Sequence, residues 1–169
     1  MRRLALLCVV LLSACSTFSS NVCTGPDLSG CDLRGVDFSG DRLDGRNLSY
    51  ANLEGADLSG ASLVGADLRN ANLDDADLQG ADLREAFALY ASFYRANLSK
   101  ADLRGADFSR AFMWATNLTE ANLTGGTFFA TEFNESNLEG ALIEGANFGE
   151  ADFSDTVLED SAVDPDRGK

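Results

Sequence analysis

One leucine in every five residues marks the stretch from Ala51 to Glu85, which reads ANLEG ADLSG ASLVG ADLRN ANLDD ADLQG ADLRE. Alanine stands two places before each leucine, and Asn, Asp or Ser stands between them. A helix repeats about every 3.6 residues and a strand every 2, so either element would scatter these leucines over all its faces. One inward leucine per pentapeptide requires the chain to turn after each one. This spacing predicts a solenoid whose coils bury one another's apolar residues.

The same spacing continues on both sides of this stretch without an insertion. A core position recurs at every fifth residue from Leu28 to Val163. The pattern resembles the pentapeptide repeat family, whose consensus is roughly A-[DN]-L-x-x. The resemblance implies an all-β fold, a right-handed quadrilateral β-helix over residues 26–165, with four pentapeptides per coil and about seven coils. The number of pentapeptides per coil comes from the resemblance, because a period of five does not fix it.

The charge and composition limit the classes of function. The net charge is −14 at pH 7, which argues against non-specific binding to nucleic acid or to an anionic membrane. The chain contains no histidine, which excludes Ser-His-Asp and Cys-His catalysis and removes the commonest zinc ligand. We therefore expect a single non-enzymatic domain with no catalytic residues, no metal site, no cofactor and no nucleic-acid partner.

The N-terminus has the features of an export signal. Residues 1–14 combine a basic start with an apolar run too short to span a bilayer. The run ends in Leu12-Ser13-Ala14-Cys15, which resembles a bacterial lipobox and implies lipidation of Cys15 after removal of residues 1–14. Residues 15–25 would form a lipidated tether. The alternative is an ordinary secretory signal with a coincidental cysteine.

The resemblance to lipoproteins also bears on location. It implies a membrane-anchored lipoprotein of the cell envelope. Because Ser16 rather than Asp follows the cysteine, the location in a Gram-negative cell would be the outer membrane, facing the periplasm.

Two further cysteines would remain after export. Cys31 holds the small inward position that alanine holds elsewhere, and Cys23 falls at the leucine position. In an oxidising compartment a disulfide between Cys23 and Cys31 would staple the N-terminal end, where no earlier coil covers the core. The alternative is a buried free thiol.

The first repeats place charge at inward positions. Asp41 and Arg46 stand where alanine is usual, one pentapeptide apart. Charges aimed into a narrow core are costly unless they are paired, so we expect local distortion of the coil there.

The middle of the chain departs from the pattern at Phe87-Ala88-Leu89-Tyr90. Ala88 stands where a large core residue is expected, while its neighbours hold positions that normally face solvent. With twenty residues per coil, these and other aromatic residues gather on one side and its adjoining corner, bordered by arginine. The candidate binding surface comprises Phe87, Leu89, Tyr90, Tyr94, Phe112, Trp114, Phe129, Arg95 and Arg110. The alternative is repacking, in which Leu89 turns inward to replace Ala88.

Phenylalanine becomes frequent toward the C-terminus. Phe108, Phe128 and Phe148 are twenty residues apart, so we expect their rings to stack. The last coil would expose Phe148, Phe153, Leu158 and Val163 at its open end, and the polar tail, residues 166–169, is too short to form a capping helix. This uncovered floor suggests a homodimer through the C-terminal end, or a cap by the membrane or a partner.

These features favour a membrane-anchored interaction scaffold over a catalyst. Its aromatic side would bind another envelope protein or a cell-wall glycan, with Trp114 and Tyr94 as anchors. One alternative is an acidic DNA mimic that binds a type II topoisomerase, as known within the family. The lipobox argues against it, because topoisomerases are cytoplasmic. A purely structural spacer would also fit the rod, but it leaves the aromatic side unexplained.

Overall fold

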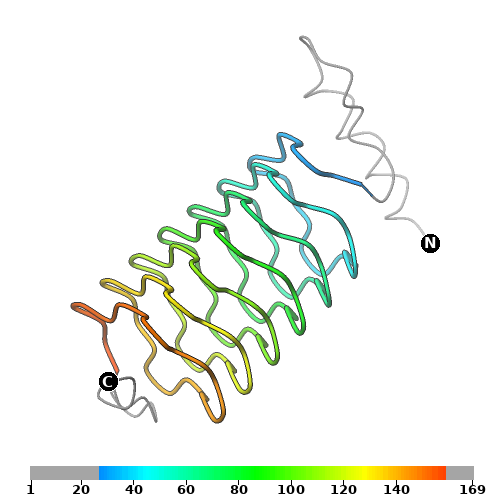
Figure 1. Ribbon diagram of the computed structural model, residues 1–169. Helices are drawn as coiled ribbons and strands as arrows, with labels where there is room; N and C mark the ends of the chain where they lie inside the picture. The colour runs from blue at the N-terminus through cyan, green and yellow to red at the C-terminus, as the bar shows by residue number, and fades with distance from the viewer. Residues whose placement is uncertain (1–26, 159–169) are drawn as a thin grey trace.

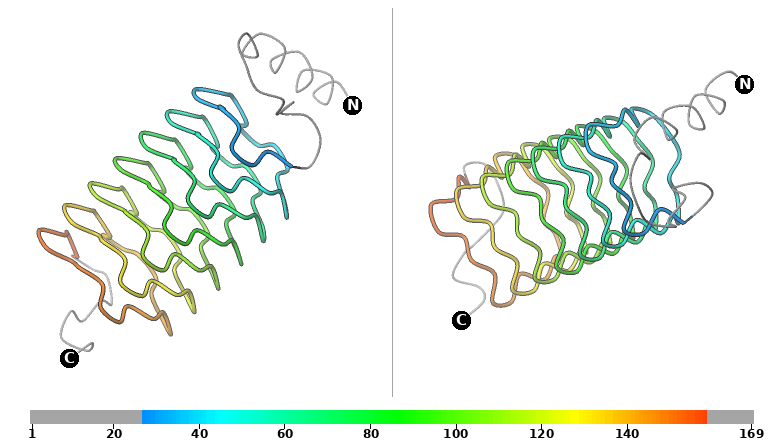
Figure 2. Two further views of the ribbon diagram at one scale, coloured as in Figure 1. Left: turned by 45° about the horizontal axis from the view of Figure 1, so that its top comes forward. Right: turned by 90° about the horizontal axis from the view of Figure 1, so that it is seen from above.

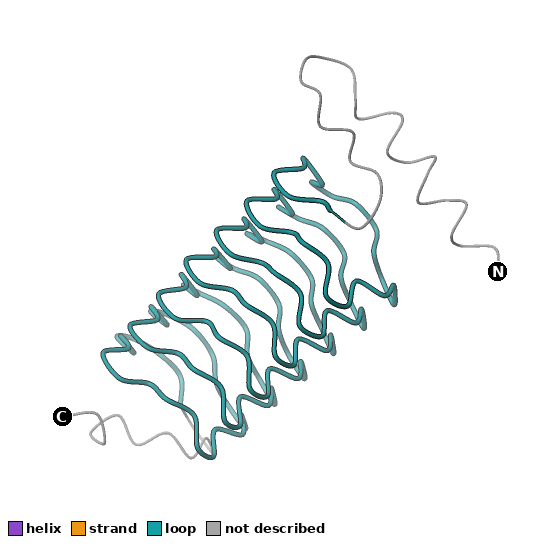
Figure 3. Ribbon diagram, turned by 45° about the vertical axis from the view of Figure 1, so that its right-hand side comes forward, coloured by secondary structure: helices purple, strands orange, loops and turns teal. Residues whose placement is uncertain are grey.

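The computed structural model describes residues 27–158, which form a rod of stacked coils (Figure 1). These residues contain no helix and no extended strand, and Figure 3 accordingly draws them throughout as loops and turns. Each pentapeptide contributes one isolated bridge residue instead. Parallel bridges join each such residue to the one twenty positions later, from Asp27–Asn47 to Asn137–Val157. A coil therefore holds four pentapeptides, and residues 27–158 form six complete coils and part of a seventh.

A tight turn ends each pentapeptide. In the first, the Leu28 carbonyl accepts a hydrogen bond from the Cys31 N–H at 3.2 Å, and Gly30 has a φ of 65°. A four-residue turn with positive φ at its third residue is of type II, and glycine adopts that conformation most easily. Repetition of this turn every five residues gives each coil four sides and four corners.

The sides and corners repeat every twenty residues and are named here in chain order. Side A is centred on Leu28, side B on Leu33, side C on Phe38 and side D on Leu43. The corners between them lie at Gly30 (AB), Gly35 (BC), Gly40 (CD) and Gly45 (DA). Figure 2 shows that the coils keep one outline along the rod.

The core consists of one large and one small residue per pentapeptide, as the period of five predicts. The central leucines, such as Leu53, are fully buried, and so are the alanines before them, such as Ala51. The Leu53 N–H donates to the Asn72 carbonyl at 2.6 Å, while the Asn52 N–H donates to the Cys31 carbonyl at 2.8 Å. Successive residues thus bond to the following and the preceding coil, so each coil depends on both neighbours.

The C-terminal coils have an aromatic core. The expected stacking on side A is confirmed: the ring centroids are 5.6 Å apart for Phe108 and Phe128, and 5.3 Å apart for Phe128 and Phe148. Hydroxyl groups replace alanine at some small inward positions, and their polarity is satisfied locally. For example, the buried Thr131 hydroxyl donates to the Phe108 carbonyl at 2.7 Å.

The expectation of local distortion at Asp41 and Arg46 is wrong, because the backbone is regular at both residues. The Asp41 N–H donates to the Phe38 carbonyl at 2.9 Å, and the Asp41 carbonyl accepts from the Ser62 N–H at 2.8 Å, as at uncharged positions. Arg46 keeps the same two backbone bonds, and both side chains are only half-buried. The side chains therefore avoid the cost of full burial while the backbone stays regular.

The end of the described chain is partly covered. Phe148, Phe153 and Leu158 are half-buried, and on side D Leu142 is exposed. Val163 and the tail, residues 166–169, lie outside the described residues. Dimerisation through this end stays a prediction.

Several predictions concern residues 1–26, which also lie outside the described range. They are the signal (1–14), the tether (15–25) and lipidation of Cys15. Cys31 is buried and disulfide-bonded. Its partner lies outside residues 27–158, because Cys31 is the one cysteine in that range, and pairing with Cys23 stays a prediction. Residues 27–158 include no helix that could cross a bilayer.

Candidate functional site

Five aromatic side chains stand exposed on two adjoining sides of the rod. Phe87 lies on side A, Tyr90 on corner AB, and Tyr94, Phe112 and Trp114 on side B; each has at least 42% of its surface exposed. We call these five residues the aromatic surface. They come from two neighbouring coils, because Ser92 of one coil is bridged to Phe112 of the next. Their predicted outward orientation is confirmed, whereas binding by them stays a proposal.

Tyr50 was not predicted as part of this region. It stands on corner AB two coils before Tyr90, and with 68% of its surface exposed it is the most exposed large hydrophobic residue among the described residues. The available signal was its position: Tyr50 and Tyr90 are forty residues apart, so twenty residues per coil places both on corner AB. In residues 27–158 every exposed aromatic side chain therefore lies on side A, side B or corner AB.

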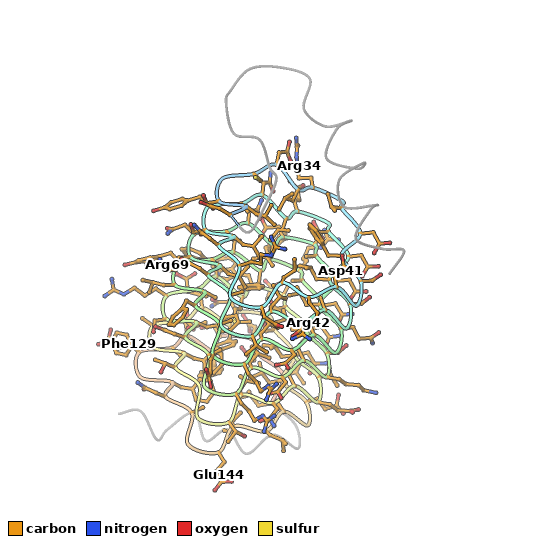
Figure 4. All side chains as sticks on the ribbon, turned by 90° about the vertical axis from the view of Figure 1, so that its right-hand side faces the viewer. Arg34, Asp41, Arg42, Arg69, Phe129 and Glu144 are labelled. Atoms are coloured by element: carbon orange, nitrogen blue, oxygen red, sulfur yellow. The ribbon has the colours of Figure 1, made fainter. Side chains whose placement is uncertain are left out.

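Leu89 and Phe129 contribute less than predicted. Both are half-buried. The Phe129 ring lies against the following coil, where a Cβ added at Gly149 would sit 3.1 Å from it. The labelled side chains of Phe129 and Arg69 project from the same flank of the rod (Figure 4). Phe129 is therefore partly a packing residue seated over Gly149.

The repacking alternative for Ala88 is not what the structure shows. Ala88 itself occupies the core position and is fully buried, while Leu89 stays outside the core. The rings of Phe93 and Phe108, which flank Ala88 along the coil and on the next coil, come within 5.3 Å of each other. These two larger side chains compensate for the small one, so the surface residues are not needed to fill the core.

The corners beside the aromatic surface carry side chains on strained backbone. Tyr90, Arg95 and Arg110 have φ values of 59°, 57° and 57°. The left-handed region costs a residue with a Cβ about 1 kcal/mol or more. Corners CD and DA mostly avoid this cost with glycine, as at Gly60, Gly65 and other positions. Non-glycine residues at positive φ are thus commoner on corners AB and BC, which border the aromatic surface, than on corners CD and DA.

Polar contacts hold two of the surface rings in place. The Trp114 indole Nε1–H donates to Glu132 Oε2 at 2.7 Å. The Arg95 guanidinium lies 6.0 Å from the centre of the Tyr94 ring and pairs with Asp75 at 3.1 Å. Cation–π contact and the ion pair together restrict Arg95 to the edge of the surface.

Tyr90 and Arg110 form a pair on corner AB. Arg110 Nη1–H donates to the Tyr90 hydroxyl at 2.6 Å, and the guanidinium lies 5.8 Å from the ring centre. This hydrogen bond raises the pKa of Arg110, whose guanidinium is charged at physiological pH in any case. The tyrosine thus positions a permanent cation.

Many polar side chains outside the aromatic surface form hydrogen bonds or ion pairs with near neighbours. Arginine two residues after an aspartate binds it in a fork, as at Asp82 and Arg84, and this hydrogen bonding lowers the pKa of the Asp82 carboxyl. On side C, Asn97 Nδ2–H donates to Asp77 Oδ1 at 3.0 Å, so amides and carboxylates stack from coil to coil. Within the described residues no group of three or more acidic residues or cysteines is arranged to hold a metal ion.

Comparison with known proteins agrees with this architecture. The family profile described as Pentapeptide repeats (8 copies) matches residues 51–87, 89–125 and 127–160. No curated protein matches the chain.

Solved structures of similar proteins include three from different biological sources. HetL, a pentapeptide repeat protein involved in heterocyst differentiation regulation from the cyanobacterium Nostoc, is 26% identical over 81% of this chain and 73% of its own, with a TM-score of 0.44. QnrB1, a plasmid-mediated fluoroquinolone resistance protein, is 29% identical over 74% and 68%, with a TM-score of 0.46. A thylakoid-lumen protein of Arabidopsis thaliana is 35% identical over 78% and 71%, with a TM-score of 0.34. With a family profile that covers more than half of its length, the chain belongs to the pentapeptide repeat family.

Proposed function

We propose that this protein is an exported, lipid-anchored and non-catalytic interaction scaffold, whose aromatic surface binds another envelope protein or a cell-wall glycan. The observation that carries the proposal is the confinement of the exposed aromatic residues of 27–158 to side A, side B and corner AB. A contiguous exposed apolar patch on a soluble domain marks an interaction site more often than chance. Aromatic residues bordered by arginine are the composition of binding hot spots.

The rigid rod suits this role. We carry the family's right-handed β-helix of about seven coils over residues 26–165 into the proposal. Its backbone bonds fix the surface residues on consecutive coils. Little conformational entropy would be lost on binding, so more of the contact energy would appear as affinity.

The proposed anchor rests on Leu12-Ser13-Ala14-Cys15. Acyl chains on Cys15 would hold the rod at an envelope membrane, because each buried CH₂ contributes about 0.8 kcal/mol. We expect Cys15→Ser to release the protein from membranes or to leave its precursor uncleaved, as read by cell fractionation. A wild-type protein found in the soluble fraction with an N-terminus elsewhere would contradict the anchor.

The acidic residues give less support to the alternative function, a DNA mimic, than the aromatic residues give to an interaction scaffold. Many carboxylates outside the aromatic surface are occupied by neighbouring arginines, as at Asp102 and Arg104. Others accept hydrogen bonds from backbone N–H groups two residues later, as at Asp57 and Ser59. These local roles account for much of the acidity without a DNA-like partner.

The test is photo-crosslinking in intact cells. A benzophenone amino acid placed at Phe87 would capture the bound molecule, whose mass and sensitivity to protease or muramidase identify its class. Removal of two hot-spot aromatics costs about 2 kcal/mol or more of binding. We therefore expect Tyr94→Ala with Trp114→Ala to abolish the adduct while thermal stability changes little, since exposed truncations cost about 0.5 kcal/mol or less.

Leu142→Ala provides the matched control, because Leu142 is an exposed apolar residue on side D. It should leave the adduct unchanged. A large loss of stability in the double variant with the adduct intact would show that the two rings are packing residues and that the binding site lies elsewhere.

A further inference from the structure

Arg110 lies on corner AB, between Phe87 on side A and the rings of Phe112 and Trp114 on side B. One coil before it on corner AB stands Tyr90, and one coil after it stands Ala130. Along its own coil the next outward residues are Phe112 and Trp114 on side B. A cation is therefore placed where exposed rings meet, on a chain whose net charge is −14.

Arg110 differs from most other basic residues of residues 27–158 in its partner. An ion pair with a carboxylate within 4.0 Å is made by Arg34, Arg42, Arg69, Arg84, Arg95, Lys100 and Arg104. Within that range Arg110 makes no such pair and instead donates to the Tyr90 hydroxyl. Glu150, two coils away on the same corner, acts on Arg110 only through longer-range attraction.

The corner geometry makes this region convex. Tyr90 and Arg110 stand at the turn between sides A and B, so the rings on the two sides face away from each other on either side of a ridge. A ridge fits a groove on a folded partner better than it fits a flat bilayer or an extended chain. In addition, the Trp114 N–H already donates to Glu132 within the chain.

We propose that the partner is a protein whose apolar groove contains a carboxylate, and that this carboxylate binds Arg110. The proposal rests on the proposed function of the aromatic surface. A carboxylate bound by an arginine fork at the centre of a water-excluding apolar contact makes a strong, orienting hydrogen-bonded pair. A second copy of this chain, in which two-fold pairing would set the same surface on both subunits, is the alternative occupant that the test distinguishes.

The experiment uses the same crosslinker at Phe87 in intact cells. Arg110→Glu should reduce the protein adduct at least tenfold, about the effect of losing one partner of a desolvated charge pair and facing it with a like charge. Arg104→Glu on side D is the matched control and should change the adduct less than twofold. Circular dichroism melting of both variants checks that the rod remains folded.

A charge exchange decides the assignment. Once the adduct is identified, the carboxylate residue in the partner's groove is replaced with Lys. This partner variant should be captured by Arg110→Glu and captured less well by the wild-type chain. The proposal would be overturned if the exchange failed to restore capture, or if Arg110→Glu and the wild type captured equally well. It would also be overturned if the adduct were a glycan, a lipid or a second copy of this chain. If Tyr94→Ala with Trp114→Ala abolishes capture and Arg110→Glu does not, the proposed function stands and this inference alone fails.

Discussion

The rod divides lengthwise into an aromatic half, sides A and B with corners AB and BC, and a polar half, sides C and D with corners CD and DA. The two halves have the same backbone turns but carry different residues at their corners. Corners CD and DA are mostly glycine, and sides C and D carry short polar residues and local ion pairs. Corners AB and BC mostly carry larger side chains at positive φ, and the exposed rings lie beside them. Since the turn and the bridges are alike in both halves, the fold itself does not require the costlier corners. The difference separates residues that build the rod from residues that the rod displays.

The largest expected effect tests whether the core is common to both halves. Leu73 on side B and Leu63 on side D are both fully buried. Replacing either with Asp would bury an unpaired charge, so we expect Leu73→Asp and Leu63→Asp each to lose about 4 kcal/mol or more of unfolding free energy, measured in urea.

Leu142→Asp, at an exposed position on side D, should change stability little by comparison. Full stability in either core variant would contradict an inward leucine at that position. A strong difference between the two variants would mean that the two halves do not share one core.

A smaller effect tests the cost of the corners. Gly60 has a φ of 62° with no atom within 4 Å of an added Cβ, so Gly60→Ala introduces backbone strain without a clash and should cost about 1 kcal/mol. Ala115 on corner BC has a φ of 52°, so Ala115→Gly should gain roughly 0.5 kcal/mol after the entropy of glycine is subtracted. Equal stability of the two variants and the wild type would remove the strain argument for the aromatic half.

The smallest expected effect concerns the ion pairs of side D. The fork from Arg84 lowers the pKa of Asp82 in the folded chain. This pair therefore contributes stability above the unfolded pKa of about 3.9, and the contribution is lost as the pH falls through the folded value. Asp82→Asn should reduce the loss of stability below pH 4 by about 0.5 kcal/mol or less, because the pair is partly exposed. An unchanged acid unfolding curve would show that the pair contributes nothing measurable.

The sequence predicts the core well because the core depends on spacing alone. A leucine at every fifth position has one inward direction in a turning chain, and Leu53 and its equivalents are buried as expected. The twenty-residue coil needed the family resemblance, and it then predicted the stack of Phe108 on Phe128. Spacing says which residues share a column, so it also predicted the exposure of Trp114.

Side-chain detail was beyond that reasoning. Whether Phe129 lies over the next coil depends on the absence of a Cβ at Gly149, which is a contact between columns rather than a spacing. The half-buried side chains of Asp41 and Arg46 avoid full burial through their local conformation. Tyr50 was missed because attention in its pentapeptide went to the inward charge of Arg46 rather than to the corner residue. The partnership of Arg110 with Tyr90 needs side-chain directions that no pattern contains.

The constant pairing of residues twenty apart also governs how such a chain can change its length. Duplication of twenty residues would lengthen the rod by about 4.8 Å, the spacing of paired strands, and leave every later side chain on its original side. Insertion of one pentapeptide would preserve the core equally well but rotate everything after it by one side. Placed after Gly80, such an insertion would move Tyr94 and Trp114 together to side C and separate them from Tyr50. Lengthening by whole coils is thus neutral for the displayed surface, whereas a change of five residues reassigns it without unfolding the protein.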